Sequence, residues 1–332
     1  MTKSARGTSY RCVKSGSSLL WRRTPVVTTT TTTTTTLPTP VDEVALKIHD
    51  VLTAAKSRDV KSTIRVDYLS EEPVNALEDS AKVGVDRALT LFAQLGFAVP
   101  NDVIVLFAKT EAGVKSILIG QGCDSWALRS PSVTFLGSTG GALNGKCSAN
   151  RVAVIASPVS GWGNPSGIEF QHTLPHELFH QWQMNSTRLC GQFACNSGDF
   201  PRWLFEGTAQ LMTRLAYASW NQSKTHQQWH DYWYDNDRKR DREMCVGVPI
   251  EEMVTPYTPW PGPGWCAYSK GQLAIELLVA NYGGMDVLRK LHTERSTSGL
   301  GDFPAFFRRI TGVELAQFYS EVNSYFVKRG WN

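Results

Sequence analysis

Apolar residues recur at helical spacing over much of the chain. Val85, Ala88, Leu89 and Phe92 follow the i, i+3, i+4, i+7 pattern of a helix that buries one face, and Gly96 ends it. The same reasoning predicts helices at 44–56, 85–95, 168–184, 202–217, 270–282, 286–293, 304–310 and 313–327. Short apolar runs rich in β-branched residues predict strands at 62–68, 102–107, 132–136 and 151–156.

The order of these elements divides the chain. Residues 1–40 include nine consecutive threonines, Thr28 to Thr36, and then a Leu-Pro-Thr-Pro run, a composition that buries little apolar area. We expect this segment to be a disordered Thr/Pro-rich linker. Strands are concentrated in residues 41–184, which end in a helix, and helices dominate residues 185–332. We expect both halves to form one α+β domain with a mixed sheet.

Composition and charge narrow the class of protein. The hydrophobic fraction of 42% and the charged fraction of 19% are typical of a globular protein with a large core. The net charge of +4 is modest and the basic run 238–240 is interleaved with acidic residues, so we expect no nucleic-acid partner. No apolar stretch reaches the roughly 18 residues of a transmembrane helix, so we expect no membrane span. We expect a monomer.

The seven cysteines bear on the compartment. Apart from Cys12, they form three sequential pairs: Cys123 and Cys147, Cys190 and Cys195, Cys245 and Cys266. Six cysteines allow about 15 pairings, and pairing of neighbours is the simplest hypothesis because each bond then closes a local loop. Each bond would stabilise the fold by about 2–4 kcal/mol. The even set indicates an oxidising compartment, extracellular or in the periplasm or cell envelope, although the N-terminus lacks the apolar core of a signal peptide.

The strongest chemical signal is the segment 174–184, Leu-Pro-His-Glu-Leu-Phe-His-Gln-Trp-Gln-Met. His176 and His180 are four positions apart, so on a helix both imidazoles can bind one metal ion. Glu177 can reach a water at that metal without binding the metal itself. A zinc hydrolase needs this arrangement of two nitrogen ligands, an open position and a carboxylate base. Pro175 predicts that the helix either begins just before it or is kinked there.

A zinc ion bound by two histidines needs a third protein ligand. The best candidate is Glu206, on the next predicted helix, in Pro201-Arg-Trp-Leu-Phe-Glu-Gly207. It follows the apolar run 203–205, where an unpaired carboxylate would be costly, and a metal removes that cost. The alternative is an ordinary exposed glutamate. We therefore predict one Zn²⁺ per chain, bound by His176, His180 and Glu206.

These two motifs resemble those of a known family. His176-Glu-Leu-Phe-His-Gln-Trp182, followed by Trp203-Leu-Phe-Glu-Gly207, is similar to the paired motif of gluzincin zinc metallopeptidases, particularly the catalytic domain of the aminopeptidase N-like branch. Tyr268-Ser-Lys-Gly271 resembles that branch's Tyr-x-Lys-Gly block, whose tyrosine donates a hydrogen bond to the oxyanion of the tetrahedral intermediate. The resemblance implies a thermolysin-like zincin domain with Glu177 and Tyr268 as its catalytic residues.

One block of that branch has no counterpart here. In the family, the glutamate of a Gly-x-Met-Glu-Asn block helps to bind the free N-terminus of the substrate. The nearest segment, Gly141-Ala-Leu-Asn-Gly145, lacks the glutamate. We therefore expect a peptide or protein substrate and leave open whether the chain is an endopeptidase or an aminopeptidase.

The expected activity is zinc-dependent hydrolysis of peptide bonds, with a metal-activated water and Glu177 as general base. Two alternatives remain. One is a non-catalytic secreted binding module that keeps the zincin fold, and the other is a zinc hydrolase that acts on a non-peptide bond.

Two supporting features are also candidates: Gln210 as a hydrogen-bond partner that orients Glu206, and strand 132–136 as an edge that pairs with a bound peptide.

Overall fold

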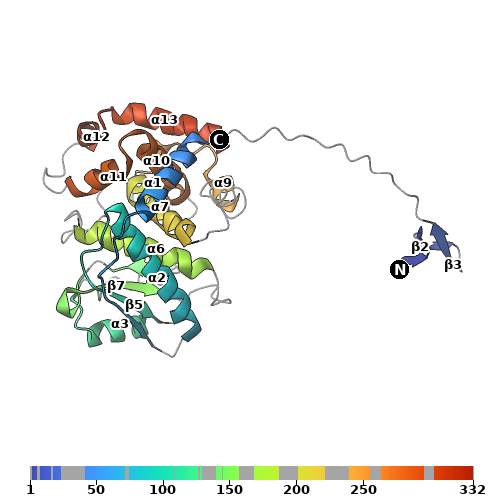
Figure 1. Cartoon of the computed structure of the whole chain (residues 1–332), viewed down its shortest axis with the longest axis horizontal. Coiled ribbons are helices and arrows are strands. Elements are labelled where there is room, and N and C mark those ends of the chain that lie inside the picture. The colour runs from blue at the N-terminus through green and yellow to red at the C-terminus, as the bar shows by residue number, and fades with distance from the viewer. Residues whose placement is uncertain are drawn as a thin grey trace. The chain divides into compact units, whose positions relative to one another are not determined.

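The computed structural model describes most of the chain, as two compact units, Met1–Val41 and Asp42–Asn332 (Figure 1). The residues that it describes are 2–5, 8–15, 18–23, 42–71, 75–108, 110–125, 128, 140–143, 145–156, 168–186, 201–220, 239–254, 263–294 and 303–331. The threonine tract, the predicted strand 132–136 and the cysteines 190 and 195 lie outside these ranges.

The first unit contains a three-stranded antiparallel sheet in the order β1-β2-β3. Its strands are β1 (Thr2–Ala5), β2 (Thr8–Ser15) and β3 (Ser18–Arg23). The sequence predicts no strands within the expected disordered linker 1–40, and residues 24–40 of that linker lie outside the described ranges. Strands of this kind are held by hydrogen bonds between neighbours in the chain, as in the pairing of Ser15 with Ser18, rather than by a strong apolar pattern.

The second unit is mostly helical with one small sheet, an α+β architecture in the broad sense. Its strands are β4 (Val66–Ser70), β5 (Val103–Phe107), β6 (Gly140–Ala142) and β7 (Val152–Ala156), in the order β4-β5-β7-β6. β4, β5 and β7 are parallel and β6 runs antiparallel to β7, which confirms the prediction of a mixed sheet. The short edge strand β6 lies in a glycine-rich stretch that carried no strand signal.

The described α-helices of this unit, some of which are visible in Figure 1, mostly overlap the helices that the sequence predicts, except that the helices at 111–120 and 239–245 were not predicted. They are α1 (Glu43–Lys56), α2 (Asn75–Leu95), α3 (Glu111–Gly120), α6 (Ile168–Ser186), α7 (Arg202–Trp220), α9 (Lys239–Cys245), α10 (Pro263–Asn281), α11 (Gly284–Thr293), α12 (Phe303–Thr311) and α13 (Leu315–Lys328). Two short 3-10 helices lie at Ser148–Asn150 and Ile250–Glu252. Among the described residues, none of the helices has both the length and the apolar character needed to cross a bilayer.

The central strand β5 separates two apolar clusters. Val103, Val105 and Phe107 belong to the large core that α2, α6, α7 and α10 share, whereas Ile104 and Leu106 belong to a smaller cluster with α3. Successive side chains of a strand point to opposite faces, so a strand covered on both faces needs a continuous apolar run. All five residues of β5 are buried accordingly.

Helix α6 is fixed against both the sheet and α2. Its Phe179 ring packs edge-on against Phe92 of α2, at 5.3 Å between ring centroids, and Trp182 packs against Phe97 at 4.8 Å. The buried Gln181 side chain donates hydrogen bonds to backbone carbonyls beside β6 and in β7. Pro175 lies inside α6, which begins at Ile168 and so confirms the predicted range 168–184, and the alternative start just before the proline is excluded. The core and sheet contacts offset the local cost of an interior proline.

Helices α7 and α10 touch through two glycines. A Cβ atom added to Gly207 would lie 2.4 Å from the backbone carbonyl carbon of Gly271, and one added to Gly271 would lie 3.0 Å from the Trp203 carbonyl oxygen. Only residues without a Cβ allow such an approach of two helix backbones. Glu206 directly precedes one glycine and Tyr268 lies one turn before the other, so this contact sets the distance between them.

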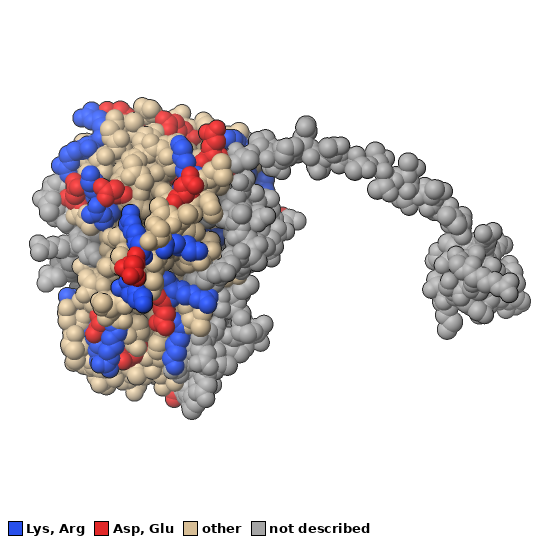
Figure 2. Space-filling model, in the orientation of Figure 1, with Lys and Arg blue, Asp and Glu red and all other residues tan. Residues whose placement is uncertain are grey.

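Two described disulfides and the Asp42 carboxylate, which caps α1, cross-link parts of the second unit that are distant in the chain. Cys123 bonds to Cys147 and Cys245 bonds to Cys266, which confirms two of the three predicted pairs. Asp42 caps α1 through one carboxylate oxygen, while the other accepts hydrogen bonds from Tyr325 and Arg329 of the C-terminal region. The face of the molecule in Figure 2 shows basic and acidic side chains interspersed over the residues that it colours.

Candidate metal centre

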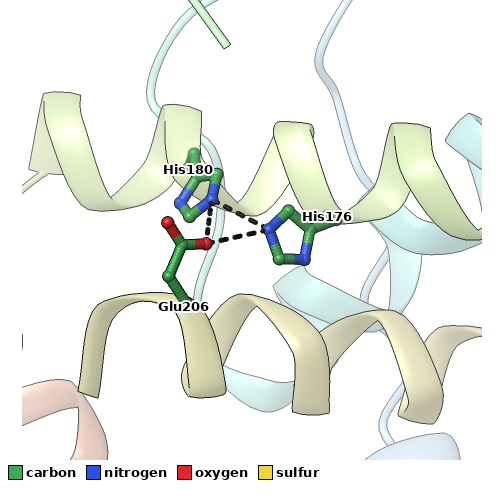
Figure 3. Close-up of side chains that lie close together, drawn as sticks. All are labelled: His176, His180 and Glu206. Atoms are coloured by element: carbon green, nitrogen blue, oxygen red, sulfur yellow. Dashed lines mark hydrogen bonds and ion pairs between the residues drawn. The ribbon is translucent and has the colours of Figure 1, made fainter. Parts of the chain in front are cut away.

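Helices α6 and α7 bring the three predicted metal ligands together (Figure 3). The two Nε2 atoms of His176 and His180 lie 3.0 Å apart. Glu206 Oε2 lies 3.2 Å from the His176 Nε2 atom and 3.3 Å from the His180 Nε2 atom. The four-residue spacing on α6 aligns the two rings, and α7 supplies the carboxylate from the opposite side.

The donor set fits a divalent metal ion of the zinc type. Ligand atoms of a tetrahedral zinc ion, bound at about 2.0–2.2 Å, lie roughly 3.3–3.6 Å from one another. The three observed separations of 3.0, 3.2 and 3.3 Å fall close to that range. His176 and His180 are each 7% exposed and Glu206 is 9% exposed, so the three groups converge in a largely buried place. Two imidazoles and one carboxylate could hold such an ion, and zinc is the prediction of the sequence.

The electrostatics of the three groups favour an anionic carboxylate. Burial by itself raises the pKa of Glu206, but the charge of His180 and the hydrogen bonds from both imidazoles outweigh burial and hold that pKa well below its usual range. Burial by itself lowers the pKa of His180, but the carboxylates of Glu206 and Glu177 raise it overall. Without a metal ion, the carboxylate thus favours the protonated form of this imidazole, and a cation bound there would replace that proton.

Gln183 orients His180, and the sequence did not single it out. The Gln183 Oε1 atom lies 2.6 Å from the Nδ1 atom of His180, and its amide nitrogen donates to the carbonyl oxygen of Phe205 at 3.0 Å. The Phe205 ring stacks on His180, with centroids 4.4 Å apart. An amide oxygen accepts the Nδ1 proton, which leaves the Nε2 lone pair of His180 for a metal. Gln183 therefore ties the ligand on α6 to the backbone of α7.

Replacing Gln183 by methionine should weaken metal binding. Loss of a hydrogen-bond partner of a metal-binding histidine typically costs about 10–100-fold in affinity, because the ring orientation and tautomer are no longer fixed. Competition with a chromophoric chelator measures this affinity. Gln181→Met is the matched control, since this neighbour is also buried but contacts the sheet backbone. Equal affinities for wild type and Gln183→Met would show that Gln183 does not support the site.

Tyr268 lies beside the first histidine. Its ring stacks on that of His176, with centroids 5.6 Å apart and planes inclined by 25°. Its hydroxyl oxygen accepts a hydrogen bond from Arg202 Nη2 at 3.3 Å. Burial and the charge of Glu206 raise the pKa of Tyr268, so the phenol stays protonated and can donate a hydrogen bond. Tyr268 lies well inside α10, because this helix begins at Pro263 rather than near residue 270 as the sequence predicted.

Glu177 is half-buried on α6, and its charge contributes to raising the pKa values of His180 and Tyr268. A carboxylate whose charge acts on both groups lies near the predicted metal centre. The catalytic roles of Glu177 and Tyr268 stay predictions. Gln210, the predicted hydrogen-bond partner of Glu206, is buried on α7, and its role stays a prediction.

No family model, no curated protein and no solved structure matches this chain.

Proposed function

We propose that this chain is a zinc-dependent hydrolase of peptide bonds, with a thermolysin-like zincin catalytic domain of the gluzincin type. The observation that carries the proposal is the convergence of His176, His180 and Glu206, whose nearest ligand atoms lie 3.0–3.3 Å apart in a buried place. A structural zinc site normally has four protein ligands, whereas a catalytic site has three and keeps one position open. Among the described residues this group has three ligands, so the His-His-Glu set favours catalysis.

The chain's own residues supply the remaining chemistry. When bound, a zinc ion activates a water molecule and polarises the substrate carbonyl. Glu177 takes a proton from the attacking water and later delivers it to the leaving amine. Tyr268, protonated and stacked on His176, donates a hydrogen bond to the carbonyl oxygen as negative charge develops there.

We propose that the protein works in an oxidising compartment. The two disulfides are consistent with an extracellular environment, and we propose an extracellular or cell-envelope location on this basis. The substrate is a peptide or protein, and the absence from the sequence of the glutamate that would bind a free N-terminus favours cleavage inside a chain.

The test combines metal analysis with two substrate classes. The full chain is purified without added chelator, its zinc content is measured, and hydrolysis of casein and of amino-acid amides is followed with and without 1,10-phenanthroline. We expect about one zinc ion per chain, as a three-ligand site predicts, and casein cleavage that stops with the chelator and returns with zinc.

The other outcomes separate the alternatives. Turnover of amides alone would make the protein an aminopeptidase. Zinc-dependent cleavage of an ester substrate, assayed in parallel, without cleavage of casein or of the amides would show a hydrolase of another bond. A stable, folded protein that binds no zinc and cleaves none of these substrates would overturn the proposal in favour of a binding module.

A further inference from the structure

Arg202, the first residue of α7, links the proposed oxyanion donor to a metal ligand. Its Nη2 atom donates to the hydroxyl oxygen of Tyr268 at 3.3 Å and lies 3.8 Å from Oε1 of Glu206. The guanidinium carbon also lies 5.5 Å from the centroid of the Tyr268 ring. The Arg202 side chain is only 17% exposed, so these contacts form largely away from solvent.

We infer that Arg202 is a positioning residue that makes the Tyr268 hydroxyl donate its proton toward the substrate carbonyl. The inference rests on the proposed function. A guanidinium group carries five donors and no acceptor, so in this hydrogen bond the phenol oxygen must accept. The hydroxyl proton of Tyr268 therefore points away from Arg202. Stacking on His176 fixes the orientation of the Tyr268 ring. The Tyr268 hydroxyl is therefore held next to a metal ligand.

Arg202 and the two histidines face different carboxylate oxygens of Glu206. Oε2 faces both histidines, at 3.2 and 3.3 Å, while Oε1 faces the guanidinium at 3.8 Å. The spacing of Arg202 and Glu206 on α7 places them one helical turn apart, where such an ion pair forms readily. The guanidinium of Arg202 thus attracts both Oε1 of Glu206 and the hydroxyl oxygen of Tyr268. The Oε2 atom of Glu206 remains available to bind the metal.

Charge adds to this geometry. The guanidinium group of Arg202 donates to the phenol oxygen at 3.3 Å and draws electron density from it. This polarisation makes the Tyr268 hydroxyl a stronger hydrogen-bond donor than it would be without Arg202. A donor of this kind strengthens its hydrogen bond as charge develops on the acceptor.

The experiment is a double-mutant cycle on the zinc-loaded full chain, with Arg202→Met, Tyr268→Phe and the combination. Removing one oxyanion donor typically lowers kcat by about 10²–10³-fold, which is the expected effect of Tyr268→Phe. Arg202→Met should lower kcat by about 10-fold or more, with KM changed by less than about 2-fold, because only the transition state gains the hydrogen bond. In the Tyr268→Phe background, Arg202→Met should change kcat by less than about 3-fold.

A binding measurement gives a readout that does not depend on turnover. In the Glu177→Gln background, calorimetry compares an uncleaved substrate peptide with a peptide phosphonate, a tetrahedral anion that resembles the transition state. Arg202→Met should leave the affinity for the substrate peptide within about 2-fold and lower that for the phosphonate by about 10-fold. Arg309→Met, which removes an exposed arginine on α12, is the charge-matched control and should change neither affinity.

The outcomes separate this inference from the proposed function. Equal losses of kcat from Arg202→Met with and without the Tyr268 hydroxyl would show that Arg202 acts independently, and the inference would be wrong. The same conclusion follows if Tyr268→Phe slows turnover while Arg202→Met does not. A wild-type chain that neither binds zinc nor cleaves a peptide would overturn the proposed function and this inference with it.

Discussion

Glu177→Gln should lower turnover by about 10²–10⁴-fold, the range that a positioned general base contributes. Glutamine has nearly the same shape but cannot take a proton, so attack by water loses its base. His176, His180 and Glu206 are unchanged, and the zinc content should stay near that of the wild type. Metal analysis and peptide hydrolysis on the same preparation measure both quantities.

Two comparisons make this result specific. Glu111→Gln, on the half-exposed start of α3, is the matched control and should keep wild-type turnover. Loss of zinc in Glu177→Gln would mean that the variant reports on metal binding rather than on proton transfer. Undiminished hydrolysis at full zinc content would exclude Glu177 as the base.

Gly207→Ala should destabilise the fold and the metal centre together. The new Cβ would lie 2.4 Å from the carbonyl carbon and 2.6 Å from the carbonyl oxygen of Gly271. Both are backbone atoms, so α7 and α10 must separate. Overpacking of this kind costs typically about 1–3 kcal/mol, and contact with rigid backbone places the expected cost at the upper end. Glu206 would move with α7, so metal affinity should fall as well.

Thermal unfolding and chelator competition measure these two effects. Gly120→Ala is the control, because Gly120 lies at the exposed end of α3, where an added Cβ would meet no atom within 4 Å. Its effect should stay within about 1 kcal/mol, the usual difference between glycine and alanine in a helix. A wild-type melting temperature for Gly207→Ala would show that the two helices do not require this close contact.

The metal ligands could be predicted from the sequence because local spacing determines much of their geometry. Two histidines one helical turn apart share a face wherever the helix lies, and a glutamate within an apolar run needs a cationic partner. The two ends of α13 were predicted to within two residues, whereas α2 begins ten residues before the predicted position 85. The start of α10 is not apparent from the sequence because Pro263 follows several other prolines between 249 and 261, although proline suits the first turn of a helix.

What the sequence could not provide depends on how separate elements meet. Gln183 contacts the backbone of α7, Arg202 contacts a residue on α10, and Gly207 faces Gly271 across a helix crossing. None of these contacts leaves a periodic or spacing signal, because each partner is distant in the chain. The helix α3 was also missed, since an early glycine weakens its helix propensity, although Thr110 caps its first turn.

The disulfide between Cys245 and Cys266 joins the end of α9 to the first turns of α10, just before Tyr268. Nearby, the ammonium group of the buried Lys270 donates hydrogen bonds to the carbonyl oxygens of Cys245, Val248 and Trp331. Under the proposed function, the oxyanion donor is then anchored covalently only after thiol oxidation. A chain with reduced thiols would lack that anchor, so reducing this bond should loosen the first turns of α10 and weaken the placement of Tyr268.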